Sequence, residues 1–186
     1  MTIPNLLTLA RILLTPLLAW LLLSGWMRTA FFVFFTAGMT DALDGLIARM
    51  LGQKSRLGSF IDPLADKLLL VTSFITLWKI GQAPLWLVLI AVGRDIVILS
   101  GFSVLFVCRV RFEIKPLASS KLTTLFELGT VFALLGRSIL ELAGWIYSAL
   151  FFTTAGFSIL SGGQYLFMGV RLLKDNRHGH GSWNGR

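Results

Sequence analysis

The chain has few residues of the kinds on which soluble domains and thiol or imidazole metal sites depend. Charged residues make up only 14% of its 186 residues, well below the share in a typical soluble domain. It has one cysteine, Cys108, and two histidines, His178 and His180, close to the C-terminal end. One cysteine excludes a disulfide within the chain, and two histidines in a polar segment make a poor metal site. These deficits argue against a cytosolic globular protein and against a metal centre built from histidine or cysteine.

Apolar residues are abundant and come in long runs. They make up 55% of the chain, the mean hydropathy is +0.78, and runs of about twenty residues match a hydrocarbon core of roughly 30 Å. We therefore predict an all-α integral membrane protein, a bundle of six transmembrane helices at residues 4–24, 29–50, 59–80, 84–108, 119–138 and 142–173. The helices would form one domain over residues 1–174, followed by a disordered polar tail at residues 175–186.

The basic residues indicate an orientation. If both termini are cytoplasmic, eleven of the seventeen basic residues face the cytoplasm, and Arg28, Lys79 and Arg137 face outward. Because cytoplasmic loops collect Lys and Arg, this distribution predicts cytoplasmic termini. We expect the membrane to be a bacterial inner membrane. The net charge of +8 then reflects contact with the lipid bilayer, and we expect no nucleic-acid partner.

Acidic residues inside the predicted helices are the feature that calls for a function. Asp41 and Asp44 are three residues apart on one helix, and Asp62 and Asp66 are four residues apart on the next. Both spacings place a pair on one helix face. A carboxylate at the bilayer centre costs about 2.5–3.5 kcal/mol, so four unpaired ones would cost on the order of 10 kcal/mol. A short loop between the two helices makes them antiparallel neighbours, so we expect the four carboxylates to converge near the cytoplasmic side.

Oxygen ligands without histidine or thiolate favour a hard cation, Mg²⁺ or else Mn²⁺ or Ca²⁺, over Zn²⁺. Four carboxylates carry four negative charges, which favours two divalent ions, an arrangement common in displacement reactions at phosphorus. A purely structural alternative is that each aspartate caps a helix or pairs with Arg49, Arg56 or Lys67.

The run from Asp41 to Asp66 reads D-x2-D-G-x2-A-R-x8-G-x3-D-x3-D. It resembles the signature of the CDP-alcohol phosphatidyltransferase family, and the opening segment 3–11 is similar to the start of that family's first helix. The resemblance implies a divalent-metal-dependent enzyme that moves a phosphatidyl group from CDP-diacylglycerol to an alcohol and releases CMP. Because family members are often homodimers, it also implies a second copy of the chain as a partner.

The resemblance assigns roles to the motif residues. It implies metal ligands at Asp41, Asp44, Asp62 and Asp66, a general base at Asp66, and a CDP-binding surface at Gly45, Ala48, Arg49 and Gly58. A carboxylate that takes the proton of an alcohol is the chemistry that such a transfer needs. Asp66 thus has two implied roles, ligand and base, which compete with each other.

Recognition of an anionic acceptor calls for basic residues near the metal site. The candidates are Arg94, Lys115, Lys121 and Arg171, although Lys115 and Arg171 also fit as cytoplasmic flanks of helices. Asp95 follows Arg94 directly, and because consecutive residues do not face each other on a helix, we expect the two to have separate partners.

Two branches of the family use glycerol-based acceptors: cardiolipin synthases of the type that uses phosphatidylglycerol, and phosphatidylglycerophosphate synthases, which use glycerol 3-phosphate. Gly93-Arg94-Asp95 and the segment 115–124 look more like the first branch. The second more often has Arg-Glu and Gly-Lys-x-Lys-Thr at these places. The resemblance favours phosphatidylglycerol as acceptor, with glycerol 3-phosphate as the alternative.

Two other classes of protein remain to be weighed. A membrane ion transporter also carries buried carboxylates, but near the midplane and on repeat-related helices, and this sequence has no visible repeat. A membrane scaffold explains the small residues by helix packing but leaves the aspartates without a role.

Overall fold

Helices make up nearly all of the chain that the structure describes. The computed structural model describes the backbone of residues 3–51, 58–107 and 118–179 and the side chains of residues 11–40, 65–101, 103 and 119–172. In chain order the helices are α1 (Ile3–Leu23), α2 (Met27–Leu51), α3 (Gly58–Lys79), α4 (Leu85–Val107), α5 (Ala118–Leu135), α6 (Arg137–Leu140) and α7 (Gly144–Gly179). The described backbone has no strand, which confirms the all-α prediction for this part of the chain.

Glycines end two of the helices where the sequence predicts breaks. Gly25, directly after α1, has a φ of 79°, in the left-handed region that glycine adopts without strain. The backbone N–H of Trp26 donates to the carbonyl of Leu21 at 2.9 Å, which closes a Schellman-type cap. Gly81, with a φ of 74°, lies in the equivalent cap after α3, where the backbone N–H of Gln82 donates to the carbonyl of Leu77 at 2.8 Å.

The first four predicted helices agree with α1–α4 to within two residues at each end. The fifth differs, because α5 ends at Leu135 and the four-residue α6 follows Gly136 as a separate helix. The last helix runs to Gly179, beyond the end of the apolar run on which its prediction was based. The helix therefore continues into residues 175–179 of the predicted tail, although four of these five residues have low helix propensity. Residues 180–186 lie outside the described residues.

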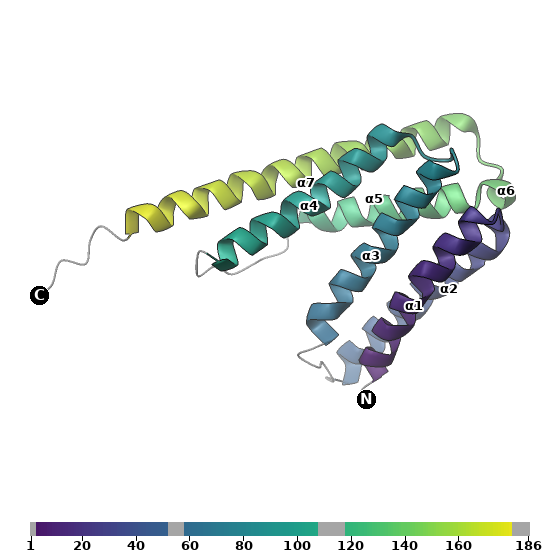
Figure 1. Ribbon diagram of the computed structural model, residues 1–186, viewed down its shortest axis with the longest axis horizontal. Helices are drawn as coiled ribbons and strands as arrows, with labels where there is room; N and C mark the ends of the chain where they lie inside the picture. Colours follow the sequence, from purple (N-terminus) through teal and green to yellow (C-terminus); the bar gives the residue numbers. More distant parts are fainter. Residues whose placement is uncertain (1–2, 52–57, 108–117, 180–186) are drawn as a thin grey trace, which may run out of the picture.

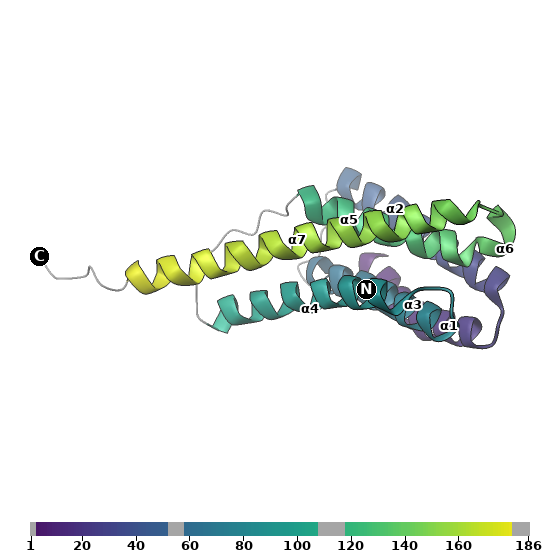
Figure 2. The same ribbon diagram turned by 90° about the horizontal axis from the view of Figure 1, so that it is seen from above.

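The long helices alternate in direction. Figure 1 shows α6 at one end of the molecule, and the start of α1 and the end of α7 both pointing away from it. α1 packs against α2 and α3, while α7 packs against α4 and α5, and Figure 2 shows α7 running alongside α4 and α5. α3 also contacts α4 and α5. The two groups of helices diverge away from α6 (Figure 1).

The apolar core lies in the half of the molecule nearer α6. Its largest fully buried apolar side chains are Leu18, Leu22, Phe74, Leu77, Leu87, Val131, Leu134 and Leu135. Large apolar side chains are also exposed on the outer surface of every long helix with described side chains, as at Leu13, Phe32 and Phe167. Such a surface suits a lipid environment better than water.

One segment of the described residues, Gly144–Leu172 in α7, is long and apolar enough to cross a membrane, and a shorter apolar helix runs over Arg11–Leu23. The part of the chain that the structure describes is therefore all-α and contains one helix of membrane-spanning length. Six spans and cytoplasmic termini stay predictions.

Candidate active site

Both halves of the aspartate motif lie on helices that residues 52–57 connect. Asp41 and Asp44 lie in the last three turns or so of α2, and Asp62 and Asp66 lie in the first three or so of α3. The other motif residues are on the same helices: Gly45, Ala48 and Arg49 on α2 and Gly58 at the start of α3. Of all these positions, only the side chain of Asp66 is among the described residues. The convergence of four carboxylates stays a prediction.

Asp66 pairs with an arginine of α1. Arg11 Nη1 donates to Asp66 Oδ1 in a salt bridge, and the side chains are 8% and 45% exposed, respectively. α1 packs along α3, so a buried guanidinium is held against a carboxylate that a ligand can still reach. In the sequence, Arg11 ends the segment 3–11 that resembles the start of the family's first helix. Its partner depends on helix packing that no local pattern reveals.

The donor set of the motif fits a hard divalent cation, because all four predicted ligands are carboxylates. Among the described residues, no group of three or more acidic, histidine or cysteine side chains is placed to hold a metal ion. Three of the four predicted ligands lie outside the described side chains. Arg11 beside Asp66 adds positive charge there, as an arrangement for an anionic phosphate ligand requires.

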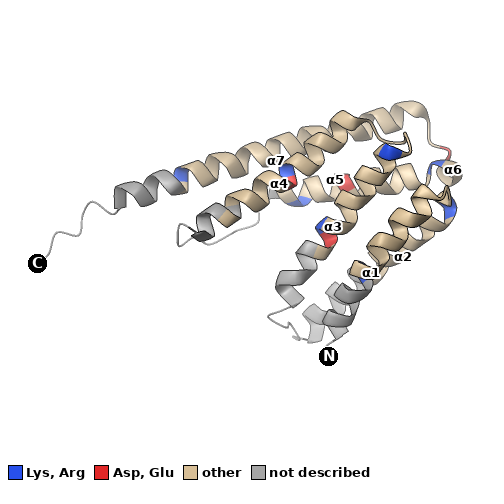
Figure 3. Ribbon diagram, viewed as in Figure 1, with Lys and Arg blue, Asp and Glu red and all other residues tan. Residues whose placement is uncertain are grey.

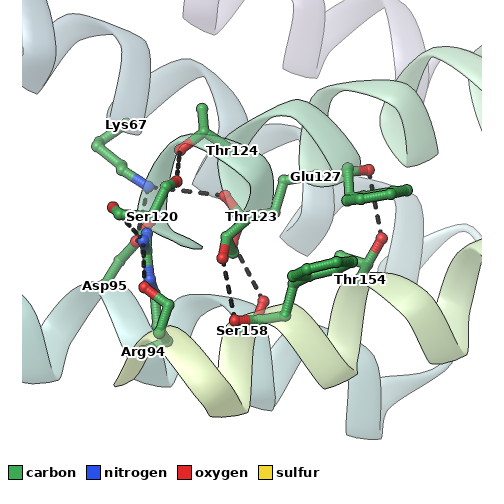
Figure 4. A network of polar contacts seen from close by, with 12 residues as sticks. Lys67, Arg94, Asp95, Ser120, Thr123, Thr124, Glu127, Thr154 and Ser158 are labelled. Atoms are coloured by element: carbon green, nitrogen blue, oxygen red, sulfur yellow. Dashed lines mark hydrogen bonds and ion pairs between the residues drawn. The ribbon is translucent and has the colours of Figure 1, made fainter. Parts of the chain in front are cut away.

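A second group of charges is buried between helices on the other side of α3. We call Lys67, Arg94, Asp95 and Glu127 the charge cluster. Lys67 Nζ donates to Asp95 Oδ1 at 2.7 Å and lies 3.6 Å from Glu127 Oε2. Arg94 Nη1 donates to Asp95 Oδ1 at 2.6 Å. Figure 4 shows Lys67 and Arg94 both reaching toward Asp95, so one carboxylate of α4 accepts from two cations.

Arg94 also binds two serines of neighbouring helices. Its Nη2 donates to Ser120 Oγ of α5 at 2.6 Å and to Ser161 Oγ of α7 at 3.0 Å. The prediction that Arg94 and Asp95 have separate partners is wrong in part, because they bind each other directly. The arginine side chain is long enough to turn back to the next residue, although each residue also has partners of its own.

The remaining acceptor candidates lie in more open surroundings. Lys121 in the first turn of α5 and Arg171 near the end of α7 are exposed, whereas Arg94 is 5% exposed. Figure 3 shows the basic residues of α5 and α7, coloured blue on the ribbon, on the parts of these helices away from α6. Lys115 lies outside the described residues.

In the sequence, Lys67 is one possible partner of the motif aspartates and Asp95 is expected to have a partner of its own, but nothing links either residue to Glu127. A buried charge in such a helix needs a partner, which is the signal that could have grouped them. Ser120 lies in the family-like segment 115–124 but had no predicted role, and nothing in the sequence indicated Ser158 or Ser161. Ser158 Oγ lies 3.5 Å from Glu127 Oε1.

The sequence is similar to known proteins over most of its length. Residues 1–157 match the CDP-alcohol phosphatidyltransferase family. The chain is 36% identical to a probable cardiolipin synthase (CMP-forming) of Drosophila melanogaster, over 75% of this chain and 48% of that protein. It is 34% identical to the cardiolipin synthase (CMP-forming) of Homo sapiens, over 94% of this chain and 64% of that protein.

A relative with another printed activity is similar at the same level. The CDP-diacylglycerol–glycerol-3-phosphate 3-phosphatidyltransferase of Aquifex aeolicus is 37% identical, over 68% of this chain and 71% of that protein. The chain spans about half to two thirds of the length of the two cardiolipin synthases named above. The match of the family over residues 1–157 includes the whole aspartate motif, and the chain belongs to the CDP-alcohol phosphatidyltransferase family.

Proposed function

We propose that this chain transfers a phosphatidyl group from CDP-diacylglycerol to the hydroxyl of a glycerol-based acceptor and releases CMP. The observation that carries the proposal is the motif from Asp41 to Asp66, whose eight fixed positions stand at the spacing of the family, within the matched region. The CMP-forming relatives support the same reaction class.

In the proposed reaction, the acceptor hydroxyl oxygen attacks the phosphorus that carries the diacylglycerol group. The new P–O bond forms as the P–O bond to CMP breaks, and CMP leaves with the electron pair of that bond. Asp66 accepts the hydroxyl proton, because an alcohol is a poor nucleophile until a base removes its proton. The 45% exposure of the Asp66 side chain is consistent with access by an acceptor.

Two Mg²⁺ or Mn²⁺ ions, held by Asp41, Asp44, Asp62 and Asp66, would neutralise charge on the diphosphate when bound. Arg11 keeps the Asp66 carboxylate oriented through its salt bridge. Gly45, Ala48 and Gly58 would allow the cytidine to approach the helix backbone, and Arg49 would bind its phosphates. These assignments follow the family motif on α2 and α3.

The acceptor we favour is phosphatidylglycerol, which makes the product cardiolipin. The cardiolipin synthases among the relatives support it. Glycerol 3-phosphate is the second candidate, because the Aquifex relative carries that activity in its name. Both acceptors are anionic, and the exposed Lys121 and Arg171, together with Lys115, are proposed to bind them. Arg94 already binds Asp95 and two serines. It would therefore stabilise the helices that carry these acceptor-binding residues rather than bind the acceptor itself.

We also propose that the long helices span a bacterial inner membrane, with the motif toward the cytoplasm. Exposed tryptophans support it, because Trp26, Trp78, Trp86 and Trp145 all lie in or next to the turns at the α6 end (Figure 1). Tryptophan concentrates at membrane–water interfaces. These four tryptophans would mark the interface between the membrane and water on the side opposite the cytoplasm.

The test of the acceptor supplies purified protein with Mg²⁺ and CDP-diacylglycerol, and separately with phosphatidylglycerol, glycerol 3-phosphate or inositol phosphate. We expect CMP and cardiolipin with phosphatidylglycerol. Phosphatidylglycerophosphate formed from glycerol 3-phosphate alone would establish the second candidate. Absence of CMP with every acceptor would contradict the proposed reaction.

A further inference from the structure

The charge cluster lies next to the proposed catalytic aspartate but has no part in the reaction above. Asp66 and Lys67 are consecutive on α3, about 100° apart around the helix. Asp66 binds Arg11 of α1, whereas Lys67 binds Asp95 of α4 and faces Glu127 of α5. Ion pairs on two sides therefore fix the rotation of α3 about its own axis.

The cluster is buried and electrically balanced. The side chains of Arg94, Asp95 and Glu127 are 3%, 8% and 2% exposed, and that of Lys67 is 27% exposed. The formal charges of its two basic and two acidic residues sum to zero. Because removing one member leaves an uncompensated buried charge, such a cluster holds its geometry more firmly than an exposed ion pair does.

The cluster joins four helices at one point. Lys67 comes from α3, Arg94 and Asp95 from α4, and Glu127 from α5, and Arg94 reaches Ser161 of α7. Figure 4 shows the four side chains of the charge cluster meeting between the helices. The cluster thus connects the helix that carries Asp62 and Asp66 to the helices that carry the proposed acceptor-binding residues.

We propose that Lys67 is a positioning residue, which acts through Asp95 and Glu127 to hold α3 in the rotation that places Asp66 in the metal and acceptor site. The proposal rests on the proposed function, since it concerns the same aspartate. Lys67 touches neither substrate in this account, because its ammonium group is already engaged by two carboxylates.

The variant that tests this role removes the ion pairs of Lys67 without leaving a net buried charge. In Lys67→Met combined with Glu127→Gln, one positive and one negative charge are lost, and Arg94 and Asp95 remain paired at 2.6 Å. Lys67→Arg is the conservative variant, which keeps the charge. Lys79→Met is the matched control, because Lys79 is an exposed lysine in the last turn of the same helix.

The first measurement is Mn²⁺ binding by electron paramagnetic resonance, with no substrate present. Loss of a group that orients a metal ligand costs 10–100-fold in metal affinity or activity, so we expect the double variant to bind Mn²⁺ about 10-fold more weakly. We expect Lys67→Arg and Lys79→Met to stay within about 2-fold of the unmodified chain, because both keep the cluster charges. Gel filtration and thermal unfolding in detergent establish that each variant is folded.

The second measurement separates kcat from KM in CMP release. Positioning predicts a kcat about 10-fold lower in the double variant, with the KM for the acceptor unchanged and kcat restored in Lys67→Arg. An increase in acceptor KM alone would instead make Lys67 an acceptor-binding residue and overturn the proposal.

Three further outcomes would also bear on the proposed role of Lys67. A folded double variant with unchanged Mn²⁺ binding and kcat would overturn the proposal. If the double variant does not fold, a folded Lys67→Arg protein that loses Mn²⁺ binding as strongly as expected for the double variant would overturn it, and one that retains binding would support it. An unmodified chain that binds Mn²⁺ but releases no CMP would contradict the proposed function alone, and the Mn²⁺ comparison would still test the role of Lys67.

Discussion

At the scale of single residues, the pair of Arg11 and Asp66 is the contact that most directly concerns the proposed chemistry. A buried guanidinium beside a half-exposed carboxylate fixes the direction of that carboxylate. The sequence predicted Asp66 from its position in a motif of fixed spacing. It could not predict Arg11 as the partner, because the two residues are 55 positions apart and meet only when α1 packs on α3.

Asp66→Asn tests the role of that carboxylate. The amide keeps the size and can still accept a hydrogen bond from Arg11, so we expect the fold to persist. Removing a general base typically lowers the rate by 10²–10⁴-fold, so CMP release from CDP-diacylglycerol should fall by at least about 100-fold. Glu141→Gln, at an exposed position next to α6, is the control. Unaltered turnover in Asp66→Asn would remove Asp66 from the mechanism.

At the scale of helices, sequence patterns predicted where helices lie along the chain better than which helices pack against each other. Apolar runs and glycine breaks predicted the first four helices. No sequence pattern predicted the contact face between α5 and α7. Each helix places three polar side chains there at the i, i+4, i+7 spacing: Thr123, Glu127 and Thr130 on α5, and Thr154, Ser158 and Ser161 on α7. Thr130 and Thr154 share a hydrogen bond of 2.8 Å. Thr and Ser are common anywhere in a membrane helix, so the sequence alone does not show which face they form.

The turn between α5 and α6 gives a stability prediction. A Cβ at Gly136 would lie 2.9 Å from Phe31 Cε2 and 2.6 Å from Leu140 Cδ1, so Gly136→Ala forces side chains to shift. Overpacking of this kind costs about 1–3 kcal/mol, and we expect a lower thermal unfolding temperature in detergent, measured by loss of helical circular dichroism.

Gly129→Ala on α5 is the control for that variant, since no atom lies within 4 Å of a Cβ there. We expect it to unfold at the same temperature as the unmodified chain or higher, because alanine favours a helix more than glycine does. Equal unfolding temperatures for Gly136→Ala and the unmodified chain would mean that the turn tolerates the extra methyl group.

At the scale of the whole molecule, the alternation of the long helices puts the start of α1 and the end of α7 on the side away from α6. The sequence analysis expects both termini on one side of a membrane because it expects six spans joined by short connections, and the six spans stay a prediction. The longer reach of α7 was not predicted, because the pattern followed apolar residues and the helix continues past them. The convergence of the aspartates depends on side chains outside the described residues.

Thiol labelling tests the membrane arrangement. In a Cys108→Ser background, Arg28→Cys and Arg171→Cys place single thiols at the α6 end and near the opposite end of α7. Residues 145–171 of a helix extend about 40 Å, enough to cross a hydrocarbon core of about 30 Å. We expect a membrane-impermeant maleimide to label only Arg171→Cys in inside-out vesicles and only Arg28→Cys in right-side-out vesicles. Labelling of both from one side would exclude the proposed topology.

The most direct measurement of the central claim is CMP release by the purified chain from CDP-diacylglycerol and phosphatidylglycerol, before and after removal of divalent ions with EDTA. Four carboxylates that hold Mg²⁺ or Mn²⁺ at the reacting phosphate predict turnover that EDTA abolishes and that added Mg²⁺ or Mn²⁺ restores. Full activity in EDTA would contradict the metal site on α2 and α3, and no CMP release in the presence of Mg²⁺ and Mn²⁺ would contradict the proposed reaction itself.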